Sequence, residues 1–317
     1  MIPSSRQPFD RRAVAKQLTR VATASVADIL ANPGMDRGGQ ARLIGITGPP
    51  GAGKSTLIGR LVAHRLGEVA PVAVVAIDPT SPRTQGSLLG DRVRMEALSE
   101  DPRVFIRSLP SRSAEDGLTE NLTEIIDTLS DFGFQEIFVE TVGVGQSAYG
   151  VRVIVDVEVL VLTPGAGDYV QAMKAGIMET ADIFVVNKSD LPGADRVIND
   201  LLGVPRPGTG GRQAPVIQVR IGDEAGVASL SKAIDACAAA TEGPDMPVRR
   251  RRTRRRYRVQ RLIQRTLLQV LEACPDTAWE APLRDNFLRI AEQLCSEARA
   301  ACQEAAHRPD AADLSRS

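Results

Sequence analysis

Hydrophobic and polar positions follow two different rhythms along the chain. Near the N-terminus, Val14, Leu18 and Val21 recur at helical spacing and predict a helix over residues 10–31, which stops at Asn32-Pro33-Gly34. From residue 42 onward, short runs rich in β-branched residues alternate with helical stretches. The predicted strands are Leu43–Thr47, Val72–Ile77, Val104–Arg107, Glu136–Glu140, Val157–Thr163, Ile183–Val186 and Val216–Val219.

These strands indicate a parallel sheet that is covered on both faces. Val72–Ile77 is apolar at every position, which is typical of a strand buried on both sides. Helical patterns such as Ser55–Leu66 and Thr119–Leu129 lie between the strands, and parallel neighbours need such crossovers. We therefore expect an α/β fold with a doubly wound, mainly parallel sheet.

A second helical region follows a break at residues 243–247, which contain Pro244 and Pro247. Arg249–Arg258 then holds eight arginines in ten residues. Two apolar stripes at helical spacing follow: Val259, Leu262, Ile263, Thr266, Leu267, Val270 and Leu271, and then Leu283, Phe287, Ile290 and Leu294. We expect an N-terminal helical extension over 1–39, a central domain over 40–242 and a C-terminal helical arm over 243–317.

Composition narrows the classes of partner. The 39 Lys and Arg balance 39 Asp and Glu, and aromatic residues make up only 3%, so neither a polyanion binder nor a base-stacking platform is indicated. The arginine run is therefore interpreted as a solvated helix face and dimer arm. No apolar run approaches the ~20 residues of a membrane span, and the N-terminus has no signal-peptide core. Together with four unpaired-looking cysteines, this favours a cytoplasmic protein that binds neither membrane nor nucleic acid.

A phosphate-binding loop follows the first predicted strand. Residues 48–55 read GPPGAGKS, matching G-x-x-x-x-G-K-S/T between a strand and a helix. Backbone N–H groups and the helix dipole would face the phosphates, Lys54 would contact the β- and γ-phosphates, and the Ser55 hydroxyl would contact Mg²⁺. The predicted nucleotide contacts in this segment are Gly48, Pro50, Gly51, Ala52, Gly53, Lys54, Ser55 and Thr56.

A guanine-reading motif follows a later strand. Asn187, Lys188 and Asp190 form N-K-x-D directly after Ile183–Val186. An Asp carboxylate can accept from N1–H and the exocyclic amine of guanine, whereas adenine offers no such pair of donors. The base site is expected to continue after the last strand, at Val219, Arg220 and Ile221.

Three carboxylates are expected at the same sheet edge. Asp78 follows one predicted strand, Asp91 closes a Gly-containing loop, and Glu140 ends another strand. Mg²⁺ prefers such hard oxygen ligands, so Ser55, Asp78, Asp91 and Glu140 form the predicted metal set. Gly143 would give the γ-phosphate a close backbone N–H. The predicted catalytic residues are Lys54, Asp91 and Glu140.

With these motifs the sequence resembles the methylmalonyl-CoA mutase-associated GTPases of the MeaB type, also known as ArgK or LAO/AO transport system kinases, within the SIMIBI class of P-loop proteins. The resemblance rests on Ile46–Thr56, Ala76–Met95, Glu140–Ser147, Thr163–Thr180 and the NKSD motif. The stretch PGAGD-x-x-Q-x-x-K-x-G, from Pro164 to Gly176, belongs to that family and not to GTPases in general.

The resemblance implies a Mg²⁺-dependent, homodimeric GTPase that gates cofactor delivery to, or protection of, an adenosylcobalamin-dependent acyl-CoA mutase. It implies three nucleotide-sensitive loops, Pro79–Asp91, Val142–Ser147 and Gly165–Lys174, the last of which would communicate with the mutase. Two alternatives stay open: a kinase linked to basic amino-acid transport, and a nickel-type metallochaperone, which two histidines and no CxxC disfavour.

Overall fold

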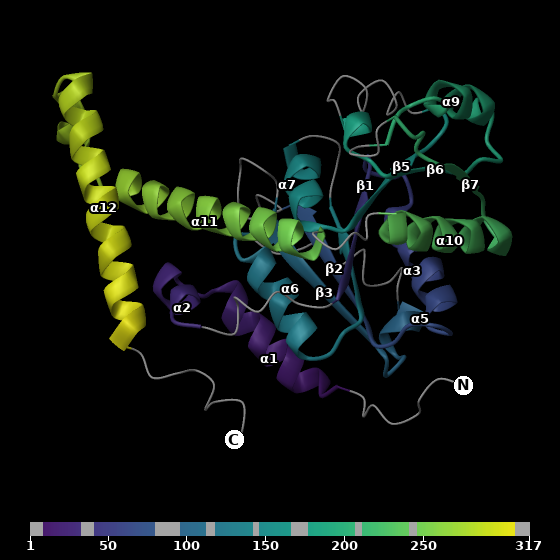
Figure 1. Cartoon of the computed structure of the whole chain (residues 1–317), viewed down its shortest axis with the longest axis horizontal. Helices are drawn as coiled ribbons and strands as arrows, with labels where there is room; N and C mark the ends of the chain where they lie inside the picture. The colour runs from purple at the N-terminus through teal and green to yellow at the C-terminus, as the bar shows by residue number, and fades with distance from the viewer. Residues whose placement is uncertain are drawn as a thin grey trace.

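The computed structural model describes residues 9–32, 41–79, 96–111, 118–141, 146–165, 177–206, 211–240 and 246–307. Its centre is a seven-stranded sheet in the order β3-β2-β4-β1-β5-β6-β7, in which every neighbouring pair is parallel (Figure 1). The strands are β1 (Arg42–Thr47), β2 (Val72–Pro79), β3 (Val104–Ser111), β4 (Glu136–Glu140), β5 (Val157–Leu162), β6 (Ile183–Asn187) and β7 (Val216–Val219). The predicted doubly wound α/β fold is confirmed.

Helices cover both faces of this sheet. The helices are α1 (Arg11–Ala22), α2 (Val26–Leu30), α3 (Lys54–Arg65), α5 (Glu96–Ser99), α6 (Leu122–Asp131), α7 (Gln146–Ile154), α9 (Ala194–Leu201), α10 (Glu224–Ala240), α11 (Met246–Glu272) and α12 (Leu283–His307), with short 3-10 turns at Ile177–Glu179 and Asp276–Glu280. One apolar cluster joins α3 and α10 to the sheet. A second joins α1, α6 and α7 to the opposite face, where α9 adds a third.

Several predicted boundaries needed correction. Strands β2 and β3 run two and four residues further than predicted, to Pro79 and Ser111, because they pair with each other along that whole length. Strand β5 ends one residue early, at Leu162. Asp78 therefore lies inside β2 and not after it.

The single N-terminal helix predicted over residues 10–31 is wrong: it is two helices. Helix α1 ends at Ala22, and α2 begins at Val26. Ser25 separates them because it forms a capping box, in which its hydroxyl accepts from the Asp28 N–H and Asp28 accepts from the Ser25 N–H at 2.8 Å. The apolar stripe of α1 packs into the core cluster of the sheet.

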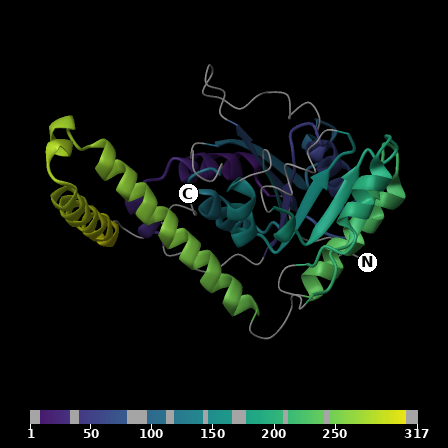
Figure 2. The same cartoon turned by 90° about the horizontal axis from the view of Figure 1, so that it is seen from above.

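The C-terminal arm begins with the long helix α11, which crosses α6 and α7 (Figures 1 and 2). The arginine run at its start is not simply a solvated face. Arg250 and Arg254 pair with Asp156 at 3.0 and 2.8 Å, and Arg258 pairs with Glu124 and Asp127 of α6. Spacing of four residues places these three arginines on one side of the helix, facing the domain.

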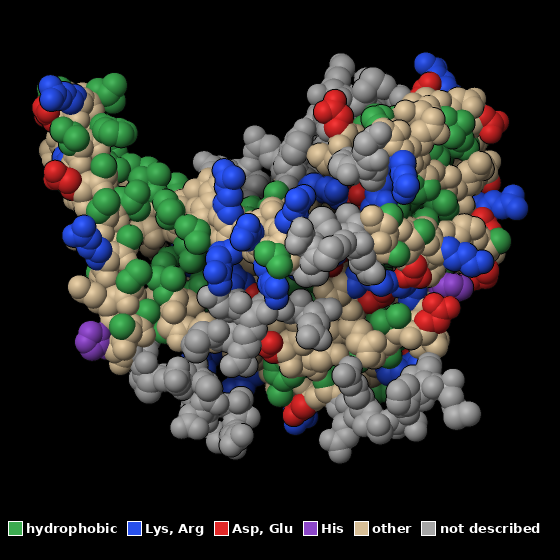
Figure 3. All heavy atoms as spheres, in the orientation of Figure 1, with side chains coloured by type: hydrophobic (Ala, Val, Ile, Leu, Met, Phe, Trp, Pro, Cys, Tyr) green, Lys and Arg blue, Asp and Glu red, His purple; other side chains and the backbone are tan. Residues whose placement is uncertain are grey.

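Some apolar residues of the C-terminal arm are buried against the domain, and others are exposed. Thr266 and Val270 are buried, and Leu262 packs against the core cluster under α1 and α6. Another set stays exposed: Val259, Ile263, Leu268, Leu283, Phe287 and Leu288. Helix α12 packs against α11 and α2, and Figure 3 shows hydrophobic side chains gathered where α11 and α12 meet. No helix in the described ranges combines the length and apolar character of a membrane span.

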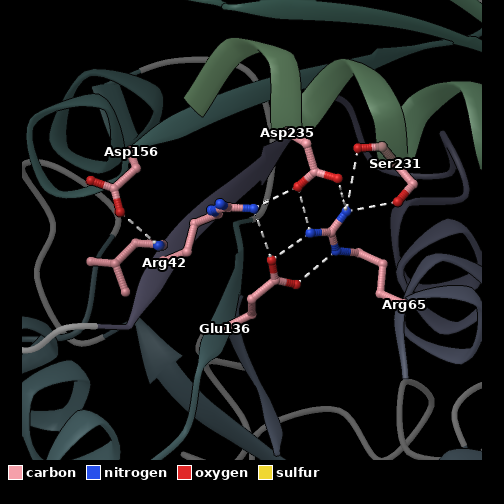
Figure 4. Close-up of polar contacts among 7 residues, drawn as sticks. Arg42, Arg65, Glu136, Asp156, Ser231 and Asp235 are labelled. Carbon is pink, nitrogen blue, oxygen red and sulfur yellow. Dashed lines mark hydrogen bonds and ion pairs between the residues drawn. The ribbon is translucent and has the colours of Figure 1, made fainter. Parts of the chain in front are cut away.

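A buried ion-pair network lies at the amino edge of the sheet, opposite the ends that follow β1 and β6 (Figure 4). Arg65, the last residue of α3, contacts Glu136 at 2.5 and 2.7 Å, Asp235 at 2.9 Å and Ser231 at 2.7 Å. Arg42 adds a contact with Asp235 at 2.5 Å. Burial alone lowers the pKa of Arg65, but hydrogen bonds to Glu136 and Asp235 outweigh it and raise the pKa above its ordinary value. The network fixes α3 and α10 beneath the sheet.

Candidate functional site

The phosphate-binding loop occupies the turning point of the sheet. Strand β1 lies at the centre, with β4 on one side and β5 on the other, and the chain after β1 enters α3. In open parallel sheets ligands bind outside the carboxyl ends of strands at such a point. The loop of residues 48–53 thus lies where a nucleotide is expected, with the N-terminus of α3 facing it.

Two glycines of this loop are required by their neighbours. A Cβ at Gly48, where φ is +144°, would lie 2.2 Å from the carbonyl oxygen of Val161 on β5. A Cβ at Gly53, where φ is +81°, would lie 2.6 Å from Nδ2 of Asn187. Only glycine fits either position without moving backbone or a motif side chain. Between them, Pro50 and Gly51 are exposed and Ala52 is buried.

The lysine predicted to bind phosphate lies over the loop. Lys54 is 7% exposed, and its Nζ donates to the carbonyl oxygens of Gly48 at 2.9 Å and Pro49 at 3.0 Å. The ammonium group is therefore held at the loop mouth by backbone acceptors. Phosphate oxygens can replace these acceptors with stronger, charge-assisted partners.

One predicted metal-side carboxylate contacts Ser55, and a second lies on the neighbouring strand. The Ser55 hydroxyl donates to Oε1 of Glu140 at 2.8 Å, although the two residues are 85 positions apart. Glu140 ends β4, and Asp78 lies near the end of the adjacent strand β2; both side chains are buried. A hydroxyl and two carboxylates form a hard-oxygen set, which fits Mg²⁺.

The N-K-x-D motif directly contacts the phosphate-binding loop. Asn187 donates from Nδ2 to the carbonyl of Ala52 at 2.7 Å, and Lys188 donates from Nζ to the carbonyl of Gly51 at 3.0 Å. Lys188 has a left-handed φ of 55°, which is uncommon outside glycine and concentrates at functional sites. Asp190 is exposed, so its carboxylate can meet a base.

The segment after β7 joins the same site. The N–H of Ser189, inside the N-K-x-D motif, donates to the carbonyl of Val219 at 3.1 Å. Val219 is buried at the end of β7, and Arg220 and Ile221 follow as exposed residues. The structure thus brings together three of the segments that the sequence assigns to the nucleotide: residues 48–56, 187–190 and 219–221.

Sequence analysis missed a buried carboxyl beneath the loop. Glu158 of β5 is 0% exposed, and Thr47, directly before Gly48, donates weakly to its Oε1 at 3.4 Å. Burial raises the pKa of Glu158 to about 8, with Arg152 opposing the rise and Asp182 adding to it. Asp182 itself pairs with Arg152 and, at 3.0 Å, with Arg206. The signal was present as an acid within the apolar run VEVLVL.

One family model matches most of the chain. The family model of the methylmalonyl Co-A mutase-associated GTPase MeaB matches residues 14–276. The chain belongs to this family. A Pyrococcus horikoshii protein named as a GTPase is 51% identical over 187 residues, 59% of this chain and 59% of that protein. The GTPase ArgK of Escherichia coli is 41% identical over 152 residues, 48% of this chain and 46% of that protein.

A mouse relative named methylmalonic aciduria type A homolog, mitochondrial, is 44% identical over 153 residues, 46% of this chain and 35% of that protein. Each of these matches spans less than two thirds of the relative's own length. A crystal structure described as an LAO/AO transport system kinase superposes with a TM-score of 0.55 at 21% identity, covering 90% of this chain and 99% of that one. That likeness supports the fold alone.

Some residues predicted for this MeaB-family chain lie outside the described ranges. They are Asp91 and Gly143, together with most of the predicted nucleotide-sensitive loops 79–91 and 165–174 and the first part of 142–147. The structure consequently places two of the three predicted carboxylates, Asp78 and Glu140.

Proposed function

We propose that the chain binds GTP at the carboxyl edge of the sheet and hydrolyses it to GDP and phosphate. The observation that carries this proposal is the contact of Asn187 and Lys188 with the carbonyls of Ala52 and Gly51, since it joins the guanine motif to the phosphate loop. Lys54 holds the β- and γ-phosphates, and Asp190 accepts from the guanine edge. The rate then comes from positioning and charge stabilisation of the transferring phosphoryl group.

Mg²⁺ fits this site as a resident ion. Ser55, Asp78 and Glu140 would hold it, with Asp91 as a further candidate from the sequence. When bound, the ion supplies neutralisation of charge on the phosphate oxygens. The residues of the chain keep their own tasks: Glu140 orients the Ser55 hydroxyl, and α3 presents its N-terminal N–H groups to the phosphates.

Release of free phosphate from GTP and from ATP tests the proposal. We expect GTP to be the preferred substrate. Asp190→Asn should weaken the binding of GTP at least about tenfold and strengthen the binding of xanthosine triphosphate, because Asn can donate to the 2-oxo group of xanthine. Equal use of ATP and GTP by the wild type would show that the guanine assignment is wrong. Consumption of GTP without free phosphate would favour the kinase linked to amino-acid transport.

The biological partner we propose is an adenosylcobalamin-dependent acyl-CoA mutase. Membership of a family described as mutase-associated supports it, as does the name of the mouse relative. We expect the mutase of the same cell to accelerate GTP hydrolysis by the full-length chain. Lys174→Ala should lose most of that acceleration and keep near-normal nucleotide affinity. An unrelated acyl-CoA enzyme is the control. No acceleration of the wild type would contradict the partnership.

We further propose that residues 243–317 form a homodimer. The support is the apolar surface that α11 and α12 leave exposed, including Ile263 at 50% and Phe287 at 71% exposure. We expect Ile263→Glu with Phe287→Glu to give a monomer that still binds nucleotide. Leu202→Glu, at an equally exposed apolar position on the central domain, is the control. Sedimentation showing a dimer for the double variant would contradict the proposal.

A further inference from the structure

An arginine in the middle of the phosphate-loop helix contacts the predicted base loop. Arg60 lies on α3, six residues after Lys54, which is about 9 Å along the helix. Its Nη1 donates to the backbone carbonyl of Arg220 at 2.9 Å, and its Nη2 pairs with Glu224 at 3.3 Å. The side chain of Arg60 is 22% exposed, whereas that of Glu224 is 76% exposed. The bond to the carbonyl is therefore the stronger part of the contact, because an exposed ion pair contributes little.

The loop that Arg60 holds is already a tight turn. The carbonyl of Arg220 also accepts from the N–H of Asp223 at 3.2 Å, and Gly222 between them has a φ of +73°. Asp223 caps the following helix by accepting from the N–H of Gly226 at 3.0 Å. Ile221, at the tip of this turn, is 90% exposed, more than any other large hydrophobic side chain in the described ranges.

These contacts close a ring around the candidate nucleotide site. The phosphate loop is bound to the N-K-x-D motif through the carbonyls of Gly51 and Ala52, and the motif is bound to β7 through Ser189 and Val219. Arg60 supplies the remaining link, from the turn after β7 back to α3. Helix α10, which follows the turn, also packs against α3, so Arg60 adds a direct link from the turn itself to the helix of the phosphate loop.

We propose that Arg60 is a positioning residue that holds the turn at residues 220–223 at a fixed distance from the phosphate loop, so that Ile221 packs against a bound guanine base. This proposal rests on the guanine site proposed above. An apolar side chain exposed at 90% gains by packing on the flat face of a base. The arginine gives no contact to the phosphates in this scheme, so its effect is confined to the base end.

The test compares GDP with inorganic pyrophosphate, which occupies the phosphate end only. With the full chain, we expect Arg60→Ala to weaken GDP about tenfold, the size expected for one lost charge-assisted hydrogen bond, and to leave pyrophosphate affinity unchanged. Ile221→Ala should likewise weaken the binding of GDP and leave the binding of pyrophosphate unchanged. The double variant should bind GDP no more weakly than the weaker-binding single variant, since both changes disturb the same contact.

Two further variants are matched controls. Glu224→Gln removes only the exposed ion pair and should change GDP affinity less than about twofold. His64→Ala alters an exposed residue one turn further along α3 and should change nothing. Arg65 and its partners hold α3 independently of Arg60, so we expect thermal unfolding of Arg60→Ala to match the wild type closely.

The results that would overturn the proposal are specific. They are unchanged GDP affinity in Arg60→Ala, an equal loss for GDP and pyrophosphate, or losses that multiply in the double variant. A wild type that binds ADP as tightly as GDP would instead reject the guanine site itself, whatever the behaviour of Arg60.

Discussion

At the amino edge of the sheet, Arg65 donates to the carboxylates of Glu136 and Asp235, whereas at the carboxyl edge Lys54 and Lys188 donate to backbone carbonyls of the phosphate loop. Both edges gather charged side chains on the same strands and helices. At the amino edge each charge has an opposite charge, and Arg65 and Glu136 are almost fully buried. At the carboxyl edge, Lys54 and Lys188 donate to backbone carbonyls, and the carboxylate of Glu140 accepts from the Ser55 hydroxyl.

This difference suggests that charged residues at the amino edge stabilise the fold, whereas those at the carboxyl edge serve binding. Removing one member of a closed, buried ion-pair network leaves another charge buried without its partner, and this costs several kcal/mol. Losing a hydrogen bond from a lysine to a backbone carbonyl costs less, about 1 kcal/mol, when water or another donor can reach that carbonyl. Substitutions at the two edges should therefore affect different measured quantities, and the predictions below test this separation.

The largest effect is expected at the amino edge. Arg65→Ala should lower the free energy of unfolding by about 3–5 kcal/mol, since Glu136, whose side chain is 2% exposed, loses its two short contacts and keeps the longer one with Arg42 at 3.4 Å. Urea unfolding measures the change. Arg103→Ala, which breaks a half-exposed pair with Asp101, is the control and should cost about 1 kcal/mol or less. Equal losses in both variants would mean that the network does not stabilise the fold beyond an exposed pair.

The second prediction concerns the carboxyl edge. Lys54→Ala should weaken GTP and GDP roughly 100-fold, because the phosphates lose a charge-assisted partner, and should barely change the free energy of unfolding. Titration calorimetry and urea unfolding measure the two quantities. Lys232→Ala, at an exposed position on α10, should change neither. A large loss of stability in Lys54→Ala would contradict the separation between the two edges.

The smallest effect lies between the edges, at Glu158. Its pKa is raised from 4.5 to about 8, so between these two pH values the folded chain keeps a proton that the unfolded chain releases. The free energy of unfolding therefore falls as the pH rises from 4.5 to about 8. Glu158→Gln should remove this dependence and make the protein more stable than wild type at pH 8, by about 2 kcal/mol, with little difference at pH 5.

Thermal unfolding across pH 5 to 8 measures this prediction. Glu272→Gln, at an exposed position on α11, should leave the pH profile parallel to that of the wild type. A Glu158→Gln variant that is less stable than wild type at pH 8 would show that the charged carboxylate is a stabilising group.

Local patterns predicted the sheet well, and they also indicated a phosphate-binding loop, each for a physical reason. Buried parallel strands need apolar residues at every position, so Val72–Ile77 was recognised from sequence. The loop 48–55 was recognised because backbone N–H groups can surround phosphate only with particular residues at fixed spacing. Both signals are contained within a few neighbouring residues.

Contacts between distant segments could not be predicted in the same way. Arg60 and Glu158 resemble any helix arginine or strand acid until β1, β7 and α10 are placed beside them. The break before α2 depended on the Ser25 capping box, which competes with a helical pattern that continues on both sides. The arginine run has a side that faces the domain because its arginines pair with Asp156, Glu124 and Asp127, which are distant from them in sequence.

The length of α11 gives its attachment a mechanical consequence. The helix has 27 residues and is therefore about 40 Å long. Arg254 ties it to the carbonyl of Ile154, the last residue of α7, and α7 starts at the end of the predicted nucleotide-sensitive loop 142–147. From Arg254 to the end of the helix at Glu272 is about 27 Å, so a tilt of about 5° at the attachment would displace that end by about 2 Å. A small tilt of α11 at its attachment to α7 would therefore produce a larger displacement where α11 meets α12.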